Sequence, residues 1–477
     1  MKEYEVVVGL EVHVELSTKT KIFCGCTTEF GGLPNTHICP VCLGLPGALP
    51  TLNERVVDYA VMTGLALDCE INRYNKFDRK NYFYPDLPKA YQISQLYIPI
   101  CQKGKIDIFS DGNKKTIGIH EIHMEEDAGK LIHSEDNTTL IDYNRCGVPL
   151  LEIVSEPDFS SASEVVAYLT KLRETLMYLG VSDCKMQEGS MRADINLSVR
   201  PKGDKNLGTR TEMKNMSSFK AIEKAIEYEA KRQIELIEKG EKVVQQTRRW
   251  DEEKEISFSM RTKEDASDYR YFPEPDLLPV EISEERIDCL KNTLPELAED
   301  KRKRYVSDLS LTEYEAEVLT SSVALSKLFE DTLEYCKSSK QVCNIILGEY
   351  MRLLKLKAVT AEDKYIDPKK IACIIELTLS NKINNNTAKE VFEEVFEKDT
   401  DPNIYIEEKG LVVVTDEAVV SKAIDEVLRV NPKSVEDYLS GKQKARGFIV
   451  GQTMKLLKGK ADPKILNTLI DEKLSKL

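Results

Sequence analysis

The stretch "VVVGLEVHVELSTKT", residues 6–20, alternates apolar and polar side chains through its middle. Strict alternation is typical of a β-strand with one buried face, because successive side chains of a strand point to opposite sides. The other face would carry Glu11, His13 and Glu15, with about 6.5–7 Å between next-but-one positions. From this strand alone two interpretations stay open: an ordinary solvated face, or a face whose carboxylates and imidazole share an ion or a substrate.

The length and composition indicate a protein with several globular domains. A chain of 477 residues is too long for one core and predicts two to four domains. Charged residues make up 31% and hydrophobic residues 41%, which excludes a disordered or fibrous class. The first residues have the pattern of a strand with acids rather than of a signal peptide, and no apolar run has the length of a membrane helix. We therefore expect a cytoplasmic protein without membrane association.

The organisation along the chain predicts an α+β fold followed by helical domains. Residues 1–293 mix short alternating runs with a few helices, one beginning near Ser160, Ser161 or Ser163 and stopping at Gly180, another running from Ser217 or Ser218 toward Gly240. Helical periodicity takes over in residues 294–405, and residues 406–477 resume it as a separate module after a turn-rich segment.

The charge of the chain is unevenly distributed. The net charge is −14, which argues against uniform binding of nucleic acid over the whole surface. Near the C-terminus, however, one run carries six positive side chains and no acid, as expected of a contact with a polyanion. A merely solvated helical face is the alternative. The run comprises Lys442, Lys444, Arg446, Lys455, Lys458 and Lys460.

Four of the 12 cysteines crowd into one segment, at Cys24, Cys26, Cys39 and Cys42. Two close pairs separated by a Gly/Pro/Asn-rich loop can bring four thiolates into the tetrahedral shell that structural zinc prefers. Unliganded thiols or a redox pair are the alternatives. Because a closed four-sulfur site has no open position for substrate, we expect Zn²⁺ to fold a knuckle here, and we expect His37 to be a loop residue rather than a ligand.

Acidic residues gather in "IHMEEDAGK", residues 122–130, and "PLLEIVSEPD", residues 149–158. Together with the polar face of the first strand they offer oxygen ligands and an imidazole, which would suit Mg²⁺ bound with substrate phosphates. The alternative is a set of solvated acidic turns. Glu152 favours the ligand interpretation, because it lies inside an apolar run where an unpaired carboxylate is costly. The set comprises Glu125, Glu126, Asp127, Glu152 and Glu156, together with Glu11 and His13.

A third segment, "DRKNYFYPDLPKAYQISQ" at residues 78–95, interleaves aromatic rings with Arg79, Lys80 and Lys89. Such a composition could stack bases and neutralise phosphate, or equally pack a loop against the core.

Taken together, these segments resemble the B subunit of the bacterial and archaeal aspartyl/glutamyl-tRNA amidotransferase. The resemblance is carried over nearly the whole chain, in the family's order, by "GLEVHVEL", "CPVCLGLPGALP", "FDRKNYFYPDLPKAYQISQ", "HMEEDAGK", "LEIVSEPD", "SDYRYFPEPDLLP" and "GFIVGQTMKLLKGKADP".

The resemblance implies an enzyme subunit acting on mischarged Glu-tRNA(Gln), Asp-tRNA(Asn) or both. ATP would phosphorylate the side-chain carboxylate of the attached amino acid, and ammonia from a separate amidase subunit, carried through a tunnel, would then displace the phosphate. The family assembles as a heterotrimer with the amidase and a small bridging subunit. Its B subunit has a cradle domain with an antiparallel sheet, related to glutamine synthetase, then an all-α helical domain and a tRNA-binding tail domain. We expect these at residues 1–293, 294–405 and 406–477.

The resemblance also implies roles for single residues. Glu11, His13, Glu125 and Glu152 would bind Mg²⁺, or Mn²⁺ because imidazole is an atypical Mg²⁺ ligand, with Glu126 as a reserve ligand. Lys80, Tyr82 and Lys89 would line the ammonia entry or contact the reacting phosphate, with Arg192 and Asp194 nearby. The expected catalytic set is thus Glu11, His13, Lys80, Glu125 and Glu126, and the expected nucleotide-binding set is Tyr82, Lys89, Arg192 and Asp194.

Two other functions compete with this one. A noncatalytic adaptor that binds tRNA through a zinc knuckle and a basic tail would need none of the acids. A stand-alone metal hydrolase is less favoured, because the sequence has no HExxH motif.

Overall fold

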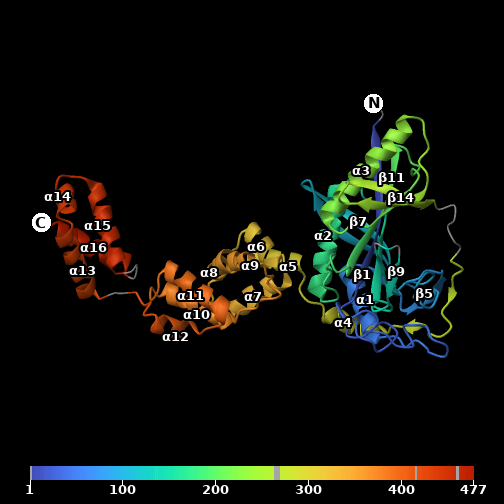
Figure 1. Ribbon diagram of the computed structural model, residues 1–477, viewed down its shortest axis with the longest axis horizontal. Helices are drawn as coiled ribbons and strands as arrows, with labels where there is room; N and C mark the ends of the chain where they lie inside the picture. The colour runs from blue at the N-terminus through green and yellow to red at the C-terminus, as the bar shows by residue number, and fades with distance from the viewer. Residues whose placement is uncertain are drawn as a thin grey trace. The chain divides into compact units, whose positions relative to one another are not determined.

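The computed structural model describes residues 3–134, 136, 138–262, 269–413, 416–457 and 461–476. It divides into two compact units, Met1–Leu297 and Ala298–Leu477, and each is considered by itself. Figure 1 shows that strands and helices combine in the first unit, whereas the second is helical. The α+β class with helical C-terminal parts is therefore confirmed. Lys458 and Lys460 of the basic run lie outside the described residues.

The first unit is built on a sheet of nine strands in the order β14-β13-β12-β11-β1-β10-β7-β6-β2. Neighbouring strands run antiparallel except β12 and β13, which are parallel, so the expected antiparallel sheet contains one parallel pair. The strands are β1 (Tyr4–Glu15), β2 (Glu70–Ile71), β6 (Cys101–Ser110), β7 (Asn113–Glu126), β10 (Pro149–Ser155), β11 (Met191–Pro201), β12 (Thr211–Lys214), β13 (Gln246–Asp251) and β14 (Ile256–Thr262).

Strand β1 lies at the centre of this sheet and confirms the predicted alternation. Val8, Val12 and Val14 are fully buried in the core of the unit, while the polar side chains between them are only partly buried. The polar side chains of β1 therefore share one face with those of β10 and β11, the strands paired to it on either side.

Helices contribute to the core beneath the sheet. They are α1 (Glu54–Ala66), α2 (Ala162–Leu179), α3 (Phe219–Glu238) and α4 (Glu284–Asn292). Helix α2 packs on β6, and α3 packs on β11. Both predicted helices are confirmed with their serine N-caps: the Ser161 and Ser218 hydroxyls accept backbone N–H groups of the first turns. Gly180 ends α2 in the left-handed conformation at φ 68°, whereas the C-cap of α3 is Lys239, one residue before the predicted Gly240.

The aromatic and basic segment of residues 78–95 forms part of a small sheet beside the large one. Its strands are β4 (Asp78–Asn81), β5 (Tyr91–Ser94) and β15 (Phe272–Pro273), and β5 contacts β7 of the large sheet. Arg79 of β4 stabilises this sheet, because its guanidinium donates hydrogen bonds to both carboxylate oxygens of the buried Glu274, at 2.7 and 2.9 Å. Two further pairs are β3 (Tyr74–Asn75) with β16 (Val280–Glu281), and β8 (Lys130–His133) with β9 (Thr139–Asp142).

The second unit contains two apolar clusters. The first gathers side chains between Tyr305 and Leu411, and the second those between Val420 and Leu474. The expected boundary at 405 falls inside helix α12 (Pro402–Glu408), whose Ile406 belongs to the first cluster. The three-domain division stays a prediction. No helix in the described part of the chain is both long and apolar enough to span a bilayer.

The helices of this unit are α5 (Ala298–Ser307), α6 (Glu313–Thr320), α7 (Val323–Leu333), α8 (Ser339–Ile345), the π-helical turn Ile346–Tyr350, α9 (Met351–Lys357), α10 (Pro368–Leu379), α11 (Asn385–Lys398), α12 (Pro402–Glu408), α13 (Glu417–Val430), α14 (Pro432–Leu439), α15 (Gln443–Leu456) and α16 (Pro463–Leu474).

Candidate active site

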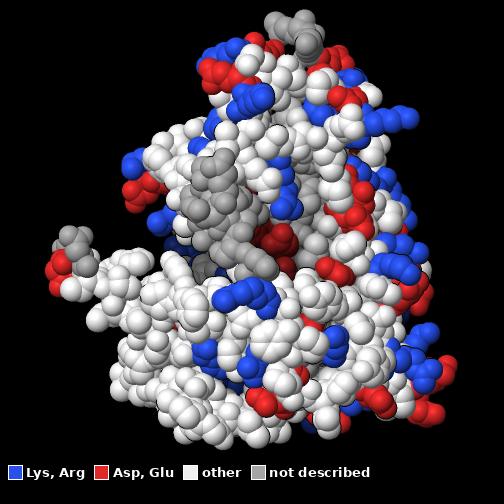
Figure 2. Space-filling view, turned by 90° about the vertical axis from the view of Figure 1, so that its right-hand side faces the viewer, with Lys and Arg blue, Asp and Glu red and all other residues white. Residues whose placement is uncertain are grey.

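The polar face of the large sheet is hollowed. Figure 2 shows a hollow with acidic side chains at its floor and basic side chains near its rim. The sheet unit contains a pocket of about 980 Å³, and its lining includes Glu15, Arg145, Arg192, Asp194, Arg249 and Trp250. These residues come from β1, β11, β13 and the loop before β10. A cavity of this size is sufficient for a nucleotide or another ligand of similar volume.

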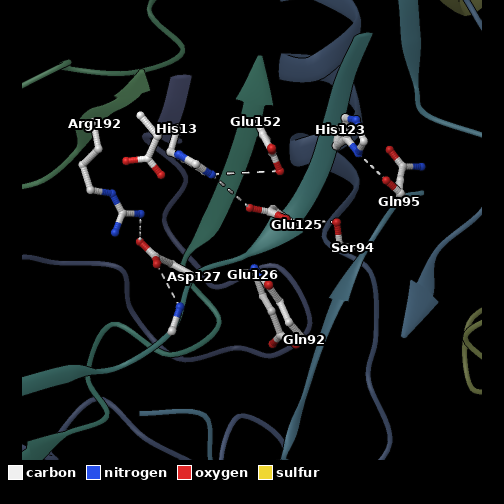
Figure 3. A network of polar contacts seen from close by, with 12 residues as sticks. His13, Gln92, Ser94, Gln95, His123, Glu125, Glu126, Asp127, Glu152 and Arg192 are labelled. Atoms are coloured by element: carbon white, nitrogen blue, oxygen red, sulfur yellow. Dashed lines mark hydrogen bonds and ion pairs between the residues drawn. The ribbon is translucent and has the colours of Figure 1, made fainter. Parts of the chain in front are cut away.

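His13, Glu125 and Glu152 converge next to this pocket: none of the three lines it, but Arg192, the register partner of His13, does. The register pairs His13 of β1 directly with Glu152 of β10, and Glu125 of β7 lies on the same face because it pairs with Leu150, two residues before Glu152. His13 Nε2 lies 3.9 Å from Glu125 Oε1 and 4.0 Å from Glu152 Oε2. Figure 3 shows the three side chains pointing toward one another. One ligand atom from each lies within 4.8 Å of the others, a spacing that fits one shared divalent cation.

The electrostatics of this group also favour a cation. Glu125 is 3% exposed, and burial together with the charge of Glu152 raises its pKa, against the opposing effects of His13 and Lys80. The Ser94 hydroxyl donates to its other oxygen at 2.9 Å. Burial alone would lower the pKa of Lys80, but the carboxylates of Glu125 and Glu152 and the hydroxyl of Tyr271 raise it above its usual range. A bound metal ion would place a positive charge beside Glu125 and Glu152 and would so stabilise the charged form of both carboxylates.

Glu11 lies in a second acidic group on the same face. With Asp194 of β11 and Glu212 of β12 it forms a set whose ligand atoms lie within 4.8 Å of one another. A cation from the chain is already present, because the Lys214 ammonium pairs with Asp194 and, at 3.1 Å, with Glu212. The structure therefore places Glu11 and Asp194 together, in a group next to the one that contains His13.

Arg192 lines the large pocket, and a buried carboxylate holds its guanidinium in place. Its Nη2 donates to Asp127 Oδ2 at 2.6 Å, and Arg145 Nε lies 3.6 Å from the same oxygen. Burial, and next the negative charge of Asp127, raise the pKa of Glu15 to about 8. Arg145 and Arg249 are pocket residues that the sequence patterns did not indicate. The strand register brings Arg249 of β13 here, and the loop that precedes β10 brings Arg145.

Glu126 and Lys89 form a separate pair. Successive strand residues face opposite sides, so Glu126 points away from Glu125. Its Oε1 accepts from the Lys89 ammonium and from the Ile93 backbone N–H. Lys80 and Tyr82 lie instead near Glu125, with the Lys80 ammonium 5.0 Å from the ring centre of Tyr269.

The four clustered cysteines come together as well. Their sulfur atoms lie within 4.8 Å of one another, and His37 is not in the group. The Cys39 backbone N–H donates to Cys42 Sγ at 3.1 Å. The hydrogen bond from Cys24 is the main cause that lowers the pKa of the Cys42 thiol to about 5. Four thiols in so small a volume fit a tetrahedral Zn²⁺ site.

The comparisons with known proteins agree over the whole chain. Residues 6–288 match the model of the GatB/GatE catalytic domain, and residues 327–474 match the model of the GatB domain. The protein of Lachnoclostridium phytofermentans is 60% identical over 477 residues, covering 100% of both chains. That of Caldicellulosiruptor saccharolyticus is 56% identical over 479 residues, again 100% of both, and that of Thermoanaerobacter sp. 54% over 475 residues, 99% of this chain and 100% of the relative. Each of the three is named as the B subunit of aspartyl/glutamyl-tRNA(Asn/Gln) amidotransferase.

Proposed function

Because the chain belongs to the family of aspartyl/glutamyl-tRNA(Asn/Gln) amidotransferase B subunits, we propose that its sheet unit performs the ATP-dependent transamidation of a mischarged tRNA. The substrate is Glu-tRNA(Gln), Asp-tRNA(Asn) or both. The side-chain carboxylate of the attached amino acid takes the γ-phosphate of ATP, and ammonia then displaces phosphate to give the amide. Activation is needed because a free carboxylate would have to expel oxide.

The observation that carries this proposal is the convergence of His13, Glu125 and Glu152 beside a pocket of about 980 Å³. In the proposal these three side chains hold Mg²⁺ or Mn²⁺, and Glu11 supports them from the neighbouring strand position. A bound divalent ion would offset the negative charge of the transferring phosphate. Ser94 holds the Glu125 carboxylate through its hydroxyl, so one oxygen remains oriented toward His13.

In this proposal, positively charged side chains around the carboxylates contact the phosphates of ATP. Lys80 lies close enough to Glu125 and Glu152 for their charges to raise its pKa, so it remains an ammonium at neutral pH and can contact the transferring phosphate. Arg192 lines the large pocket with a fixed guanidinium, because Asp127 holds one end of it. Asp194 and Tyr82 complete the proposed nucleotide-binding set.

Ammonia would arrive from the side of Lys89 and Glu126. This pair lines a pocket of about 80 Å³ that also contains Phe23, Tyr91 and Ile93. A carboxylate in such a place can take a proton from ammonium, which cannot attack an acyl phosphate until it is deprotonated. In this proposal Lys89 and Glu126 act at the entry, whereas Lys80 and Tyr82 act at the reacting phosphate.

The remaining parts of the chain bind the partners. A B subunit belongs to a multi-subunit enzyme. We assign ammonia production to an amidase partner, assembly to a small bridging subunit, and tRNA binding to the helical tail with its basic run. The enzyme would work in the cytoplasm. The four cysteines would hold a structural Zn²⁺, with no open coordination position and no part in the transfer steps.

The experiment that tests the proposal compares His13→Ala and Glu125→Ala in the assembled enzyme. Both variants should lose transfer of the γ-phosphate to Glu-tRNA(Gln), followed with labelled ATP, while filter binding of tRNA stays unchanged. His120→Ala is the matched control, because this histidine lies on the same strand as Glu125 but its side chain is 57% exposed. Full activity of both site variants would favour the noncatalytic tRNA-binding adaptor.

A further inference from the structure

Lys21 is a fully buried lysine, with 0% of its surface exposed. Lysine is almost never buried to this extent unless its ammonium has a partner. Here the ammonium donates to the His37 backbone carbonyl at 2.7 Å and lies 3.8 Å from Cys42 Sγ. It therefore sits against the group of four cysteines, where its positive charge needs an anion.

Within the part of the chain that the structure describes, no carboxylate supplies that anion. Among the described residues, no ion pair includes Lys21. Glu126 lines the same small pocket as Lys21, but its carboxylate pairs with the Lys89 ammonium and accepts the Ile93 N–H. A carbonyl oxygen satisfies one proton of the ammonium but does not balance its charge, and burying an unbalanced charge is costly.

A metal bound by the four cysteines would hold all four sulfur atoms as thiolates, and would so fix an excess of negative charge beside Lys21. One dipositive ion and four thiolates leave two negative charges in excess, and one thiolate would belong to Cys42, next to Lys21. We propose that Lys21 is the internal counter-cation of this metal centre, so that binding of the metal and burial of the Lys21 charge stabilise each other. The inference rests on the proposed metal centre and goes beyond it, because it assigns a positioning role to a residue that is not a ligand.

A simpler role for Lys21 makes a different prediction. If its ammonium only tethers the loop through the His37 carbonyl, replacing it would weaken the fold equally with and without metal. If it balances the charge of the centre, replacing it weakens the metal-loaded protein more than the metal-free protein. The loss of stability caused by the substitution is measured with metal and without metal, and the difference between these two losses is the coupling energy between Lys21 and the metal, as in a double-mutant cycle.

The test uses the full chain with Zn²⁺ as the metal. We would measure zinc content by mass spectrometry, zinc release to a colorimetric chelator, and thermal unfolding with and without zinc. Lys21→Met removes the charge at similar volume, and Lys21→Gln removes it while keeping a donor for the His37 carbonyl. Lys19→Met is the matched control, because Lys19 is exposed two positions away.

Both Lys21 variants should bind zinc about 10- to 100-fold more weakly and release it correspondingly faster, and zinc should raise their unfolding temperature less than it raises that of the wild type. Lys19→Met should behave as wild type. Absence of bound metal from the wild-type protein would overturn the metal centre itself. Zinc bound by the wild type and by both variants with equal affinity, or an equal loss of stability in the loaded and metal-free forms, would overturn the role of Lys21 alone.

One measurement on the wild type does not depend on the variants folding. In the zinc-loaded chain, Lys21 should resist an amine-reactive label that modifies Lys19, and removal of zinc should raise its labelling at least tenfold. Unchanged protection of Lys21 after zinc removal would contradict the proposal.

Discussion

Replacing Glu125 with glutamine should separate the stability of the fold from its function. The substitution keeps the shape of the side chain and an oxygen that can accept the Ser94 hydroxyl, but it removes a negative charge that is 3% exposed. Without metal, that charge opposes Glu152. At 4.8 Å, the upper limit for their ligand atoms, two unit charges repel by about 3.5 kcal/mol at an effective dielectric constant of about 20.

The net gain in stability should be smaller, because His13 and Lys80 attract the same carboxylate. We expect Glu125→Gln to raise the metal-free free energy of unfolding by about 1–2 kcal/mol at neutral pH. With an unfolding entropy of about 2.1 cal/mol/K per residue over the Met1–Leu297 unit, this corresponds to about 2–3 °C in melting temperature.

The effect should depend on pH in a defined direction. Since the pKa of Glu125 is raised above 4.5, the folded protein holds this proton more tightly than the unfolded chain does. The stabilisation from that proton is complete below the unfolded pKa and is lost as the pH rises through the folded pKa. The advantage of Glu125→Gln over wild type should therefore grow as the pH rises from 4.5, the ordinary pKa of a glutamate, toward neutrality.

The assay is thermal unfolding of the full chain at several pH values, with and without Mg²⁺. Mg²⁺ should raise the melting temperature of the wild type and leave that of Glu125→Gln unchanged, because a ligand is lost. Glu223→Gln, on the exposed face of α3, is the control and should change neither quantity. A metal-free variant less stable than wild type, or one that Mg²⁺ stabilises as well as wild type, would refute the reasoning.

Three further predictions test separate parts of the account. Gly44→Ala would place a Cβ 2.4 Å from Lys89 Cγ, and it should reduce ammonia-dependent amidation while phosphorylation continues. Gly47→Ala is the control: it introduces the same left-handed backbone strain of about 1–2 kcal/mol, but its Cβ meets nothing within 4 Å, so amidation should stay unchanged. Equal amidation by these two variants would argue against the entry role of Lys89. Lys444→Gln and Lys455→Gln, exposed on α15, should each lower the salt dependence of tRNA binding by about one unit of log–log slope, and unchanged slopes would remove the tail from the tRNA contact. Arg79→Met leaves the buried Glu274 carboxylate without its ion-pair partner and should lower the free energy of unfolding, measured in urea, by about 3–5 kcal/mol. Arg200→Met breaks a more exposed ion pair with Glu5 and should lower it by about 1 kcal/mol or less. Similar losses in the two variants would show that burial does not decide the difference.

Local patterns predicted the parts of the fold that local physics decides. Alternation in the first strand, the serine N-caps of α2 and α3 and the glycine C-cap of α2 depend on residues close in sequence, and these predictions were confirmed. The pairing of β1 with both β10 and β11 joins segments more than 100 residues apart. No local pattern specifies that register, which explains why the nine-strand order was not predicted.

The same limit applies to the candidate site. The sequence indicated that several acids lie near His13, but it did not show that they form two separate groups. The register places Glu11 beside Asp194 and brings His13 to Glu152, so the acids form two groups rather than one. That Glu125 and Glu126 face opposite sides does follow from strand periodicity, once the segment is recognised as a strand.

The most direct test of the central claim is the coordination of a paramagnetic ion. Mn²⁺ would be added with ATP to the full chain, and pulsed electron paramagnetic resonance would detect imidazole nitrogen bound to the ion. The account predicts a nitrogen coupling in the wild type that persists in His120→Gln and disappears in His13→Gln. Mn²⁺ bound without any imidazole coupling, or a coupling that survives His13→Gln, would contradict the claim that His13, Glu125 and Glu152 hold the cation together.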